Sequence, residues 1–194
     1  MKRILDFALS AIGLAILSPL LLVVMIAIKL QDHGPVFYRA RRVGLQGKEF
    51  FLFKFRTMIV HADKVGPGIT LACDQRITQV GRVLRHYKLD ELPQLINVVR
   101  GEMALVGPRP EDPRYAAMYN EDQRRILSIL PGVTSPASLC FKDENSILEG
   151  PDWGKKYVTE VAPQKIAIDL DYFGHNTLCT DFGVIFRTIV AIVR

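Results

Sequence analysis

Cysteine and histidine are scarce in this chain of 194 residues, and neither forms a recognisable pattern. The three cysteines, Cys73, Cys140 and Cys179, are isolated and odd in number, with no C-x-x-C spacing. The four histidines are scattered along the chain. These features argue against a disulfide framework and a zinc site, and indicate reduced thiols in a cytosolic compartment. The sequence also has no internal repeats and no low-complexity segments.

Charged residues make up 23% of the chain and hydrophobic residues 49%, which excludes a disordered protein and allows one domain with a real core. The formal net charge is +5. A basic balance favours anionic partners, which include nucleic acid, anionic lipid headgroups and phosphorylated substrates. Mean hydropathy is +0.16, high for a soluble protein, and one N-terminal segment accounts for much of it.

That segment, Phe7–Lys29, has no charge before Lys29 and is long enough to cross a bilayer as one helix. It is too long for the apolar core of an ordinary signal peptide, and no small-residue cleavage site follows it, so we expect it in the mature protein. Ser18 and Pro19 lie close to its middle. Proline kinks a helix, and serine can bond the backbone groups that the kink frees.

Two topologies fit this segment. Basic residues prefer the cytoplasmic side of a membrane. They flank the segment at both ends: Lys2, Arg3, Lys29, Arg39, Arg41 and Arg42. Such flanks are unfavourable for a straight span and are satisfied by a re-entrant hairpin, which returns to the side that it entered. Kinked spanning helices are also common, so the residues alone leave both topologies open.

The rest of the chain predicts short strands followed by helices. Aromatic and β-branched runs between turn signals predict strands at Val36–Arg41 and Glu49–Phe55, and a polar loop over residues 61–75. Residues 132–154 are predicted to form a loop. Helical spacing and end signals predict helices at Thr78–Tyr87, from near Pro93 to Gly101, at Arg114–Leu130, at Trp153–Asp171 with an interruption near Pro163, and at Thr180–Val193. The last is apolar nearly all round but too short to span, so we expect it to be buried or at the membrane interface.

Asp90 and Glu91 are adjacent carboxylates at or just before the expected helix start near Pro93. Alone, such a pair is more often a solvated helix cap than a functional site. Nearby arginines change that balance, because a guanidinium matches two phosphate oxygens at once and a helix N-terminus offers N–H groups to the same anion. They are Arg56, Arg82, Arg85 and Arg109. Carboxylates beside arginines indicate a Mg²⁺-assisted phosphoryl-transfer site.

Four motifs closely resemble the bacterial sugar transferase family, the monotopic polyprenyl-phosphate phosphoglycosyl transferases. They are Lys54–Met58 (KFRTM), Leu89–Leu95 (LDELPQL), Val106–Pro110 (VGPRP) and Pro131–Thr134 (PGVT). The resemblance covers essentially the whole chain. It implies transfer of a sugar-1-phosphate from a nucleotide diphosphate sugar, expected to be a UDP-sugar, to polyprenyl (undecaprenyl) phosphate, with release of UMP. This would be the first membrane step towards exopolysaccharide, capsule, O-antigen or glycoprotein glycans.

The resemblance implies roles for individual residues. Asp90 would be the nucleophile that forms a covalent phosphosugar–aspartyl intermediate, and Glu91 would help bind Mg²⁺ or act as a base, so both are the expected metal ligands. Arg109 would hold a phosphate, with Arg85, Arg56 and Lys54 as further phosphate-side candidates. Ser18 and Pro19 match the kink of the family's re-entrant helix. Structural roles are expected for Asp169, Tyr172 and Asp181.

We therefore expect an α/β protein, mostly α with a small β-hairpin, in two parts. Residues 1–32 would form the re-entrant membrane helix, and residues 33–194 a compact cytosolic catalytic domain with interfacial helices. The resemblance implies the bacterial inner membrane as its location, with the catalytic domain on the cytoplasmic face. The expected partners are the nucleotide sugar, the polyprenyl phosphate and the bilayer, but no nucleic acid; a homo-oligomer is a further option.

Two other functions compete with this one. A membrane-anchored nucleic-acid-binding protein would account for the basic charge, but no RNP, helix-turn-helix or zinc pattern is present. A non-catalytic scaffold in glycan assembly would have been free to lose the Asp90–Glu91 pair and the Pro-Arg-Pro motif. One segment, Ser135–Leu139, departs from the family pattern, which leaves open whether its loop contacts the sugar or the nucleotide.

Overall fold

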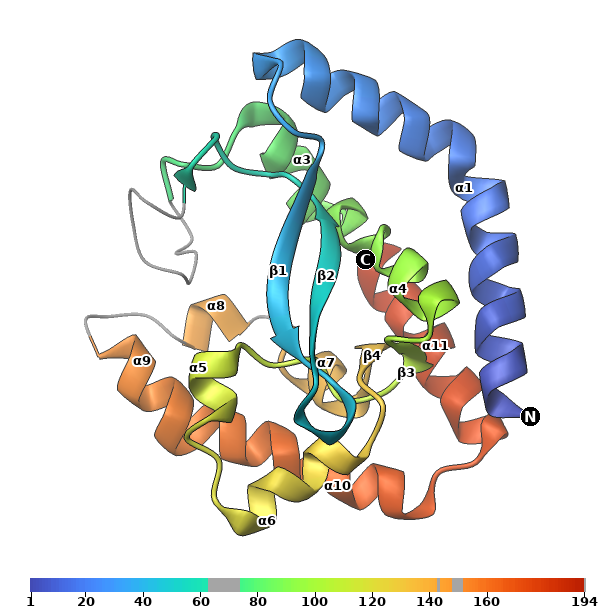
Figure 1. Ribbon diagram of the computed structural model, residues 1–194, viewed down its shortest axis with the longest axis vertical. Helices are drawn as coiled ribbons and strands as arrows, with labels where there is room; N and C mark the ends of the chain where they lie inside the picture. The colour runs from blue at the N-terminus through green and yellow to red at the C-terminus, as the bar shows by residue number, and fades with distance from the viewer. Residues whose placement is uncertain (63–73, 143, 148–151, 194) are drawn as a thin grey trace.

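The protein is mostly helical, with one β-hairpin and one short pair of parallel strands (Figure 1). The structure is a computed structural model and describes residues 1–62, 74–142, 144–147 and 152–193. The predicted mixture of helices and a small hairpin is confirmed. Most of the predicted loop over residues 61–75 lies outside the described residues.

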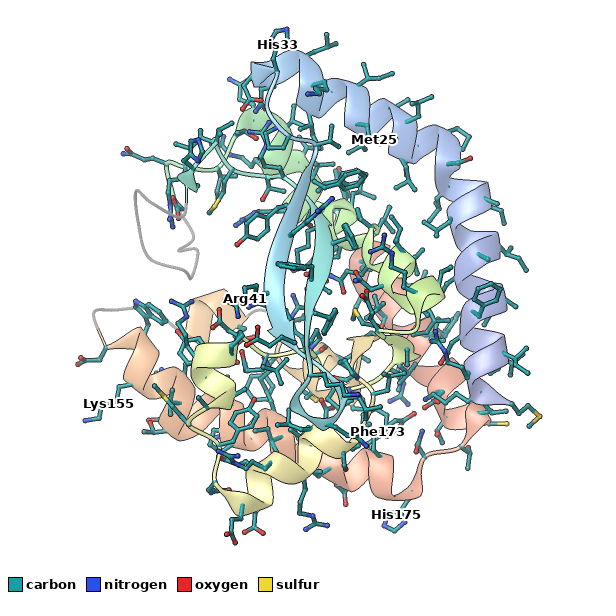
Figure 2. All side chains as sticks on the ribbon, viewed as in Figure 1. Met25, His33, Arg41, Lys155, Phe173 and His175 are labelled. Carbon is teal, nitrogen blue, oxygen red and sulfur yellow. The ribbon has the colours of Figure 1, made fainter. Side chains whose placement is uncertain are left out.

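Helix α1 (Lys2–Asp32) contains the whole apolar N-terminal segment, with Pro19 inside it. It bends part-way along and arcs around the rest of the protein (Figure 1). Among the described helices, it is the one that is long and apolar enough to cross a membrane, and only 11% of its most apolar stretch is buried. Side chains project outward from it along its length, as far as His33 at its end (Figure 2). A core helix of a soluble protein would be mostly buried, so α1 has the character of a membrane-associated helix.

The N-terminal end of α1 is fixed to the domain by its basic residues. The Arg3 guanidinium donates hydrogen bonds to the carbonyl oxygens of Val98 (2.7 Å) and Met103 (2.9 Å). Lys2 forms an ion pair with the buried carboxylate of Asp181. Asp181 also accepts a hydrogen bond from Tyr172, which confirms the structural roles predicted for these two residues.

The other end of α1 is fixed to the same domain. Asp32 forms an ion pair with Arg56 at the end of the hairpin. Val24 and Ile28 of α1 are buried in one core cluster with residues of the hairpin and the following helix, Phe55 and Leu84. The middle of α1 is exposed between these two attachments. Within residues 10–26 the most exposed large apolar side chains are Ile12, Ile16, Leu22, Val23 and Ile26.

The hairpin consists of β1 (Phe37–Val43) and β2 (Glu49–Phe55), which pair antiparallel with Phe37 opposite Phe55. The first strand begins and ends later than predicted, because Arg42 and Val43 still pair with residues of β2. A short 3₁₀ turn, Leu45–Gly47, joins the strands. Neighbouring side chains in a strand point to opposite faces, so Phe55 is buried in a core cluster while Lys54 points away from that cluster and reaches Glu91.

Two helices follow the hairpin and position the carboxylate pair. α3 (Gln79–His86) begins at Thr78, whose hydroxyl accepts the Gly81 N–H. A 3₁₀ turn, Leu89–Glu91, precedes α4 (Gln94–Arg100). α4 starts after Pro93 and ends at Gly101, whose φ of 92° is left-handed, as the end signals predicted.

The parallel pair joins β3 (Ala104–Val106) to β4 (Gly132–Thr134), with Ala104 opposite Gly132. The prediction of a loop over residues 132–154 was therefore wrong in part. Residues 132–134 are a strand that lies beside β3, a pairing distant in sequence. The same region also contains α7 (Pro136–Cys140), where the Ser135 side chain caps a helix that starts with proline, and α8 (Glu144–Ile147).

The predicted helix Arg114–Leu130 was also wrong, because the chain turns within it. It is divided into α5 (Pro113–Ala116), α6 (Glu121–Arg124) and a 3₁₀ turn, Arg125–Ser128. Asn120 makes a capping box with Gln123, in which each side chain bonds the other's backbone, and this starts a new helix.

The C-terminal part contains α9 (Trp153–Lys156), a π-helical turn (Tyr157–Val161), α10 (Ala162–His175) and α11 (Leu178–Val193). The expected interruption near Pro163 is the π turn, and proline occupies the first turn of α10. Within α10, buried Asp169 accepts the Ala137 N–H (3.0 Å) and so fixes the start of α7, the structural role predicted for it. Burial raises the pKa of Asp169 to about 6.

Candidate active site

Two positively charged side chains from separate elements meet at Glu91. The Lys54 ammonium reaches from β2 and lies 2.8 Å from Oε1 of Glu91. Arg109, in the Pro-Arg-Pro segment after β3, places Nη2 2.6 Å from Oε1 and Nη1 3.3 Å from Oε2. Both oxygens of Glu91 are therefore bonded to cations.

Asp90 precedes Glu91 but has a different environment. It is buried, and it accepts no hydrogen bond and forms no ion pair within the described part of the chain. Burial raises the pKa of Asp90, the adjacent charge of Glu91 raises it further, and the more distant charges of Lys54 and Arg85 act against this. Its carboxylate is thus poorly solvated and has no hydrogen-bond or ion-pair partner among the described residues.

The pKa of Glu91 is displaced in the opposite direction. Burial opposes its ionisation, but Arg109 and Lys54 outweigh burial and hold the pKa well below its usual range. For Lys54 burial is the largest influence and lowers the pKa, although Glu91 opposes it. The two neighbouring carboxylates therefore differ. Glu91 is stabilised as an anion between two cations, whereas the negative charge on Asp90 is destabilised by burial and by the charge of Glu91.

Arg85 lies on the Asp90 side of the site. Its Nε donates to the Thr57 hydroxyl at 2.8 Å, and burial lowers its pKa while the charge of Asp90 acts to raise it. Thr57 is held against α3 where the helix has no side chain: a Cβ on Gly81 would lie 2.0 Å from the Thr57 carbonyl oxygen. Thr57 was not a predicted site residue, although it lies in the KFRTM motif.

Arg56 lies in the same cavity wall but is not brought to Glu91. Its guanidinium pairs with Asp32 and donates to the carbonyl oxygens of Pro35 (2.6 Å) and Met58 (3.2 Å). In this arrangement Arg56 joins the end of α1 to the hairpin. Its predicted phosphate role stays a prediction. No sequence signal pointed to Asp32 as its partner.

The Pro-Arg-Pro segment is held by two glycines at the β3–β4 crossing. The Gly107 N–H donates to the Thr134 carbonyl (3.0 Å), and the Gly132 N–H donates to that of Pro108 (2.8 Å). A Cβ on Gly132 would lie 2.0 Å from the Gly107 nitrogen, so the two backbone segments are closer together than a residue with a side chain would permit. Both glycines belong to the motifs identified in the sequence.

A cavity of about 1100 Å³ opens beside these groups. This is at or above the upper end of the usual range for small-molecule sites, roughly 300–1000 Å³, and leaves room for a substrate with several phosphates. The predicted site residues that line it are Lys54, Arg56, Arg85, Asp90, Glu91 and Arg109. Ser18 and Pro19 lie elsewhere, in the middle of α1, where the Ser18 hydroxyl bonds the Ala15 carbonyl (2.8 Å).

The fold and the site together define a membrane-associated helical protein whose cationic cavity suits phosphorylated ligands. The chain belongs to the bacterial sugar transferase family: the sequence model of that family matches residues 1–194.

Curated relatives support this membership. The chain is 39% identical to the UDP-glucose:undecaprenyl-phosphate glucose-1-phosphate transferase of Caulobacter vibrioides, over 99% of this chain and 69% of the relative. It is 37% identical to the protein of the same name from Xanthomonas campestris, over 99% of this chain but 38% of the relative. It is 35% identical to the exopolysaccharide production protein ExoY of Sinorhizobium fredii, over 98% of this chain and 84% of the relative.

Proposed function

We propose that this protein transfers a sugar-1-phosphate from a nucleotide diphosphate sugar to undecaprenyl phosphate, in exopolysaccharide synthesis or a related glycoconjugate pathway. The names of the relatives motivate the two substrates. One observation carries the proposal. Glu91 is neutralised between Lys54 and Arg109, and the adjacent Asp90 is buried with no partner bonded to it among the described residues.

Asp90 would act as the nucleophile in two balanced steps. A carboxylate oxygen bonds the phosphorus that bears the sugar, and the bond from that phosphorus to the bridging oxygen of the diphosphate breaks. UMP leaves with the electron pair, and the sugar phosphate stays on Asp90 as an acyl phosphate. An oxygen of undecaprenyl phosphate then attacks the same phosphorus, and the bond to Asp90 breaks, which regenerates the carboxylate.

The surroundings of Asp90 suit this chemistry. Phosphoryl transfer is catalysed mainly by positioning and by cations fixed around the phosphate oxygens. Arg109 and Lys54 are such cations, and Glu91 holds both of them before substrate arrives. Arg85 supplies a further positive charge on the Asp90 side. A carboxylate that water solvates poorly is also easier to bring into bond-forming contact, because less hydration has to be removed.

The residues present also fit a magnesium ion. Within the described ranges, no three side chains of His, Cys, Asp and Glu are grouped to hold a metal by themselves. Mg²⁺ does not need such a group, because it usually takes one or two carboxylates and completes its shell with substrate phosphates and water. Asp90 and Glu91 would hold it, with Asp90 the less committed of the two. When bound, Mg²⁺ would neutralise charge on the donor phosphates.

We further propose that residues 1–32 form a re-entrant membrane helix and residues 33–194 the catalytic domain, on the cytoplasmic face of the inner membrane. Both ends of α1 bond the same domain, through Arg3 and Lys2 at one end and Asp32 at the other. A helix that crossed the bilayer would place its ends on opposite sides, about 30 Å apart. Pro19 lies near the midpoint, where a re-entrant helix needs to bend.

The topology gives a clear expectation for labelling. We expect a cysteine added ahead of Met1 and a cysteine at His33 to react with a membrane-impermeant thiol reagent only from the cytoplasmic side. The background would be a chain in which Cys73, Cys140 and Cys179 are replaced by serine. Labelling of the two positions from opposite sides would rule out the re-entrant helix.

Release of nucleoside monophosphate tests the activity itself. Protein purified in detergent is incubated with Mg²⁺, undecaprenyl phosphate and each of a panel of UDP-sugars. We expect UMP release from at least one donor, together with a lipid product that carries the sugar. A well-folded protein that releases no UMP from any donor would favour the scaffold function over catalysis.

A further inference from the structure

A second set of charged and aromatic side chains lines the cavity, from α8, the π turn and α10 and from the segments on either side of α5. Tyr157 and Tyr119 both donate hydrogen bonds to Oε2 of Glu111, the latter at 3.4 Å. Lys165 places its ammonium 2.8 Å from Oε2 of Glu144 and 5.8 Å from the centre of the Tyr157 ring. All five side chains line the same cavity as Asp90, and the proposed transfer chemistry uses none of them.

We propose that Glu144 and Lys165 form the subsite that binds the hydroxyl groups of the donor sugar and so select which sugar is transferred. This inference rests on the proposed function.

The first argument is the uncommitted bonding capacity of this pair. The Lys165 ammonium has three donors, and Glu144 accepts one of them. Oε1 of Glu144 accepts no hydrogen bond from the part of the chain that the structure describes. A sugar hydroxyl is donor and acceptor at once, so a carboxylate beside an ammonium offers it both complements.

The second argument is energetic. The side chains are 13% exposed for Lys165 and 25% exposed for Glu144, so both charges have lost much of their water. An ion pair in such a position contributes little net stability, because desolvation offsets the attraction. The N–H groups of Lys165 and the carboxylate oxygen of Glu144 that are not used in this pair line the cavity. Hydroxyl groups of a ligand bound there would replace the hydrogen bonds to water that these atoms have lost.

The third argument is the place of the pair relative to the phosphate cations. The charge of Glu91 and, to a smaller extent, that of Glu144 raise the pKa of Arg109, so Glu144 lies near that guanidinium. Glu111 directly follows the Pro-Arg-Pro segment and accepts a hydrogen bond from Tyr157, whose ring lies beneath the Lys165 ammonium. The Pro-Arg-Pro segment is therefore close to the Glu144–Lys165 pair. A donor with its sugar phosphate at Arg109 therefore has the Glu144–Lys165 pair within reach of the group next to that phosphate.

The sugar suits this part of the cavity better than the nucleotide base does. Bases bind proteins largely by stacking on open aromatic faces. Tyr157 is only 6% exposed, with Tyr115 on its ring (centroids 5.0 Å apart) and the Lys165 ammonium over it. This part of the cavity therefore offers hydrogen-bonding groups and little open aromatic surface.

The test compares donors that differ in the sugar alone with donors that differ in the base alone. kcat/KM is measured for the wild type, Glu144→Gln and Lys165→Met, with UDP-glucose, UDP-galactose, their N-acetylamino counterparts and ADP-glucose. In both variants we expect kcat/KM for the preferred sugar to fall about 10- to 100-fold and the ratio between preferred and next-best sugar to shrink at least about 10-fold. The ratio of UDP-glucose to ADP-glucose should stay constant. Glu49→Gln, which removes an exposed ion pair with Arg41, should change neither ratio.

The outcomes separate this inference from the function on which it rests. If the wild type turns over a UDP-sugar but both variants keep its sugar ratios, or change the base ratio instead, the subsite is overturned and the proposed function stands. If the wild-type protein turns over no donor, both the proposed function and the proposed sugar subsite are contradicted. Thermal unfolding near that of the wild type excludes misfolding of the near-isosteric Glu144→Gln protein as the cause of a changed ratio.

Discussion

Replacement of Asp90 by Asn is expected to abolish sugar-phosphate transfer, with a loss of at least about 10⁴-fold in kcat. The amide keeps the size of the side chain but removes the nucleophile, and the cations around Glu91 remain in place. The measurement is UMP release with the preferred donor. Asp122→Asn, at an exposed position in α6, is the matched control and should retain full activity.

The same substitution is expected to stabilise the protein. In the folded state the pKa of Asp90 is raised above its usual value of 3.8, first by burial and then by the charge of Glu91. Between the unfolded and folded pKa values the folded protein binds more protons, so the free energy of unfolding falls as pH rises through that interval. At neutral pH the Asp90 charge is therefore a net cost, which the amide removes.

A rise of about 2–4 °C in the unfolding temperature at pH 7 corresponds to about 1 kcal/mol in a chain of this size. We expect this gain to disappear at acidic pH, where Asp90 is protonated in the wild type as well. An Asp90→Asn protein that is active, or that is inactive and less stable, would contradict the assignment of Asp90 as a strained nucleophile.

Gly132→Ala is expected to lower activity at least about 100-fold, although Gly132 is not among the residues that line the cavity. The new Cβ would lie 2.0 Å from the nitrogen and 2.5 Å from the Cα of Gly107, so the crossing of β3 and β4 must open. That movement breaks the hydrogen bond from Gly132 to Pro108 and displaces Arg109 from Glu91. We expect a loss of about 1–3 kcal/mol in stability from the overpacking.

Gly174→Ala is the control for this substitution. A Cβ on Gly174 in α10 meets no atom within 4 Å, and the residue is helical with no left-handed φ. Alanine there should stabilise the protein by about 0.5–1 kcal/mol and leave kcat/KM unchanged. Equal losses of activity at both positions would show that activity does not depend on the β3–β4 crossing.

Features set by neighbours in sequence were predictable, and those set by distant segments were not. The hairpin follows from aromatic and β-branched runs between turn signals, the α4 bounds at Pro93 and Gly101 from end signals, and the apolar N-terminal helix from its length. The pairing of β3 with β4 joins residues far apart in sequence and has no local signature in strands so short. The predicted helix Arg114–Leu130 was wrong because the capping box at Asn120 starts a new helix in its middle.

The site shows the same division. Residue type and motif identified Asp90, Glu91, Lys54 and Arg109, but not the difference between the two carboxylates. That difference depends on which carboxylate Lys54 and Arg109 reach across the fold. The Glu144–Lys165 pair lay outside the prediction, because its members are remote in sequence and belong to no motif.

Mass spectrometry of the intact protein tests covalent transfer most directly. The protein is incubated with Mg²⁺ and its preferred UDP-sugar, without undecaprenyl phosphate, and then digested to locate any adduct. We expect a mass increase of one sugar phosphate on the peptide that contains Asp90, lost on addition of undecaprenyl phosphate and absent from Asp90→Asn. An unmodified wild type that releases UMP only when undecaprenyl phosphate is present would contradict the covalent route, and an adduct on another residue would contradict the role of Asp90.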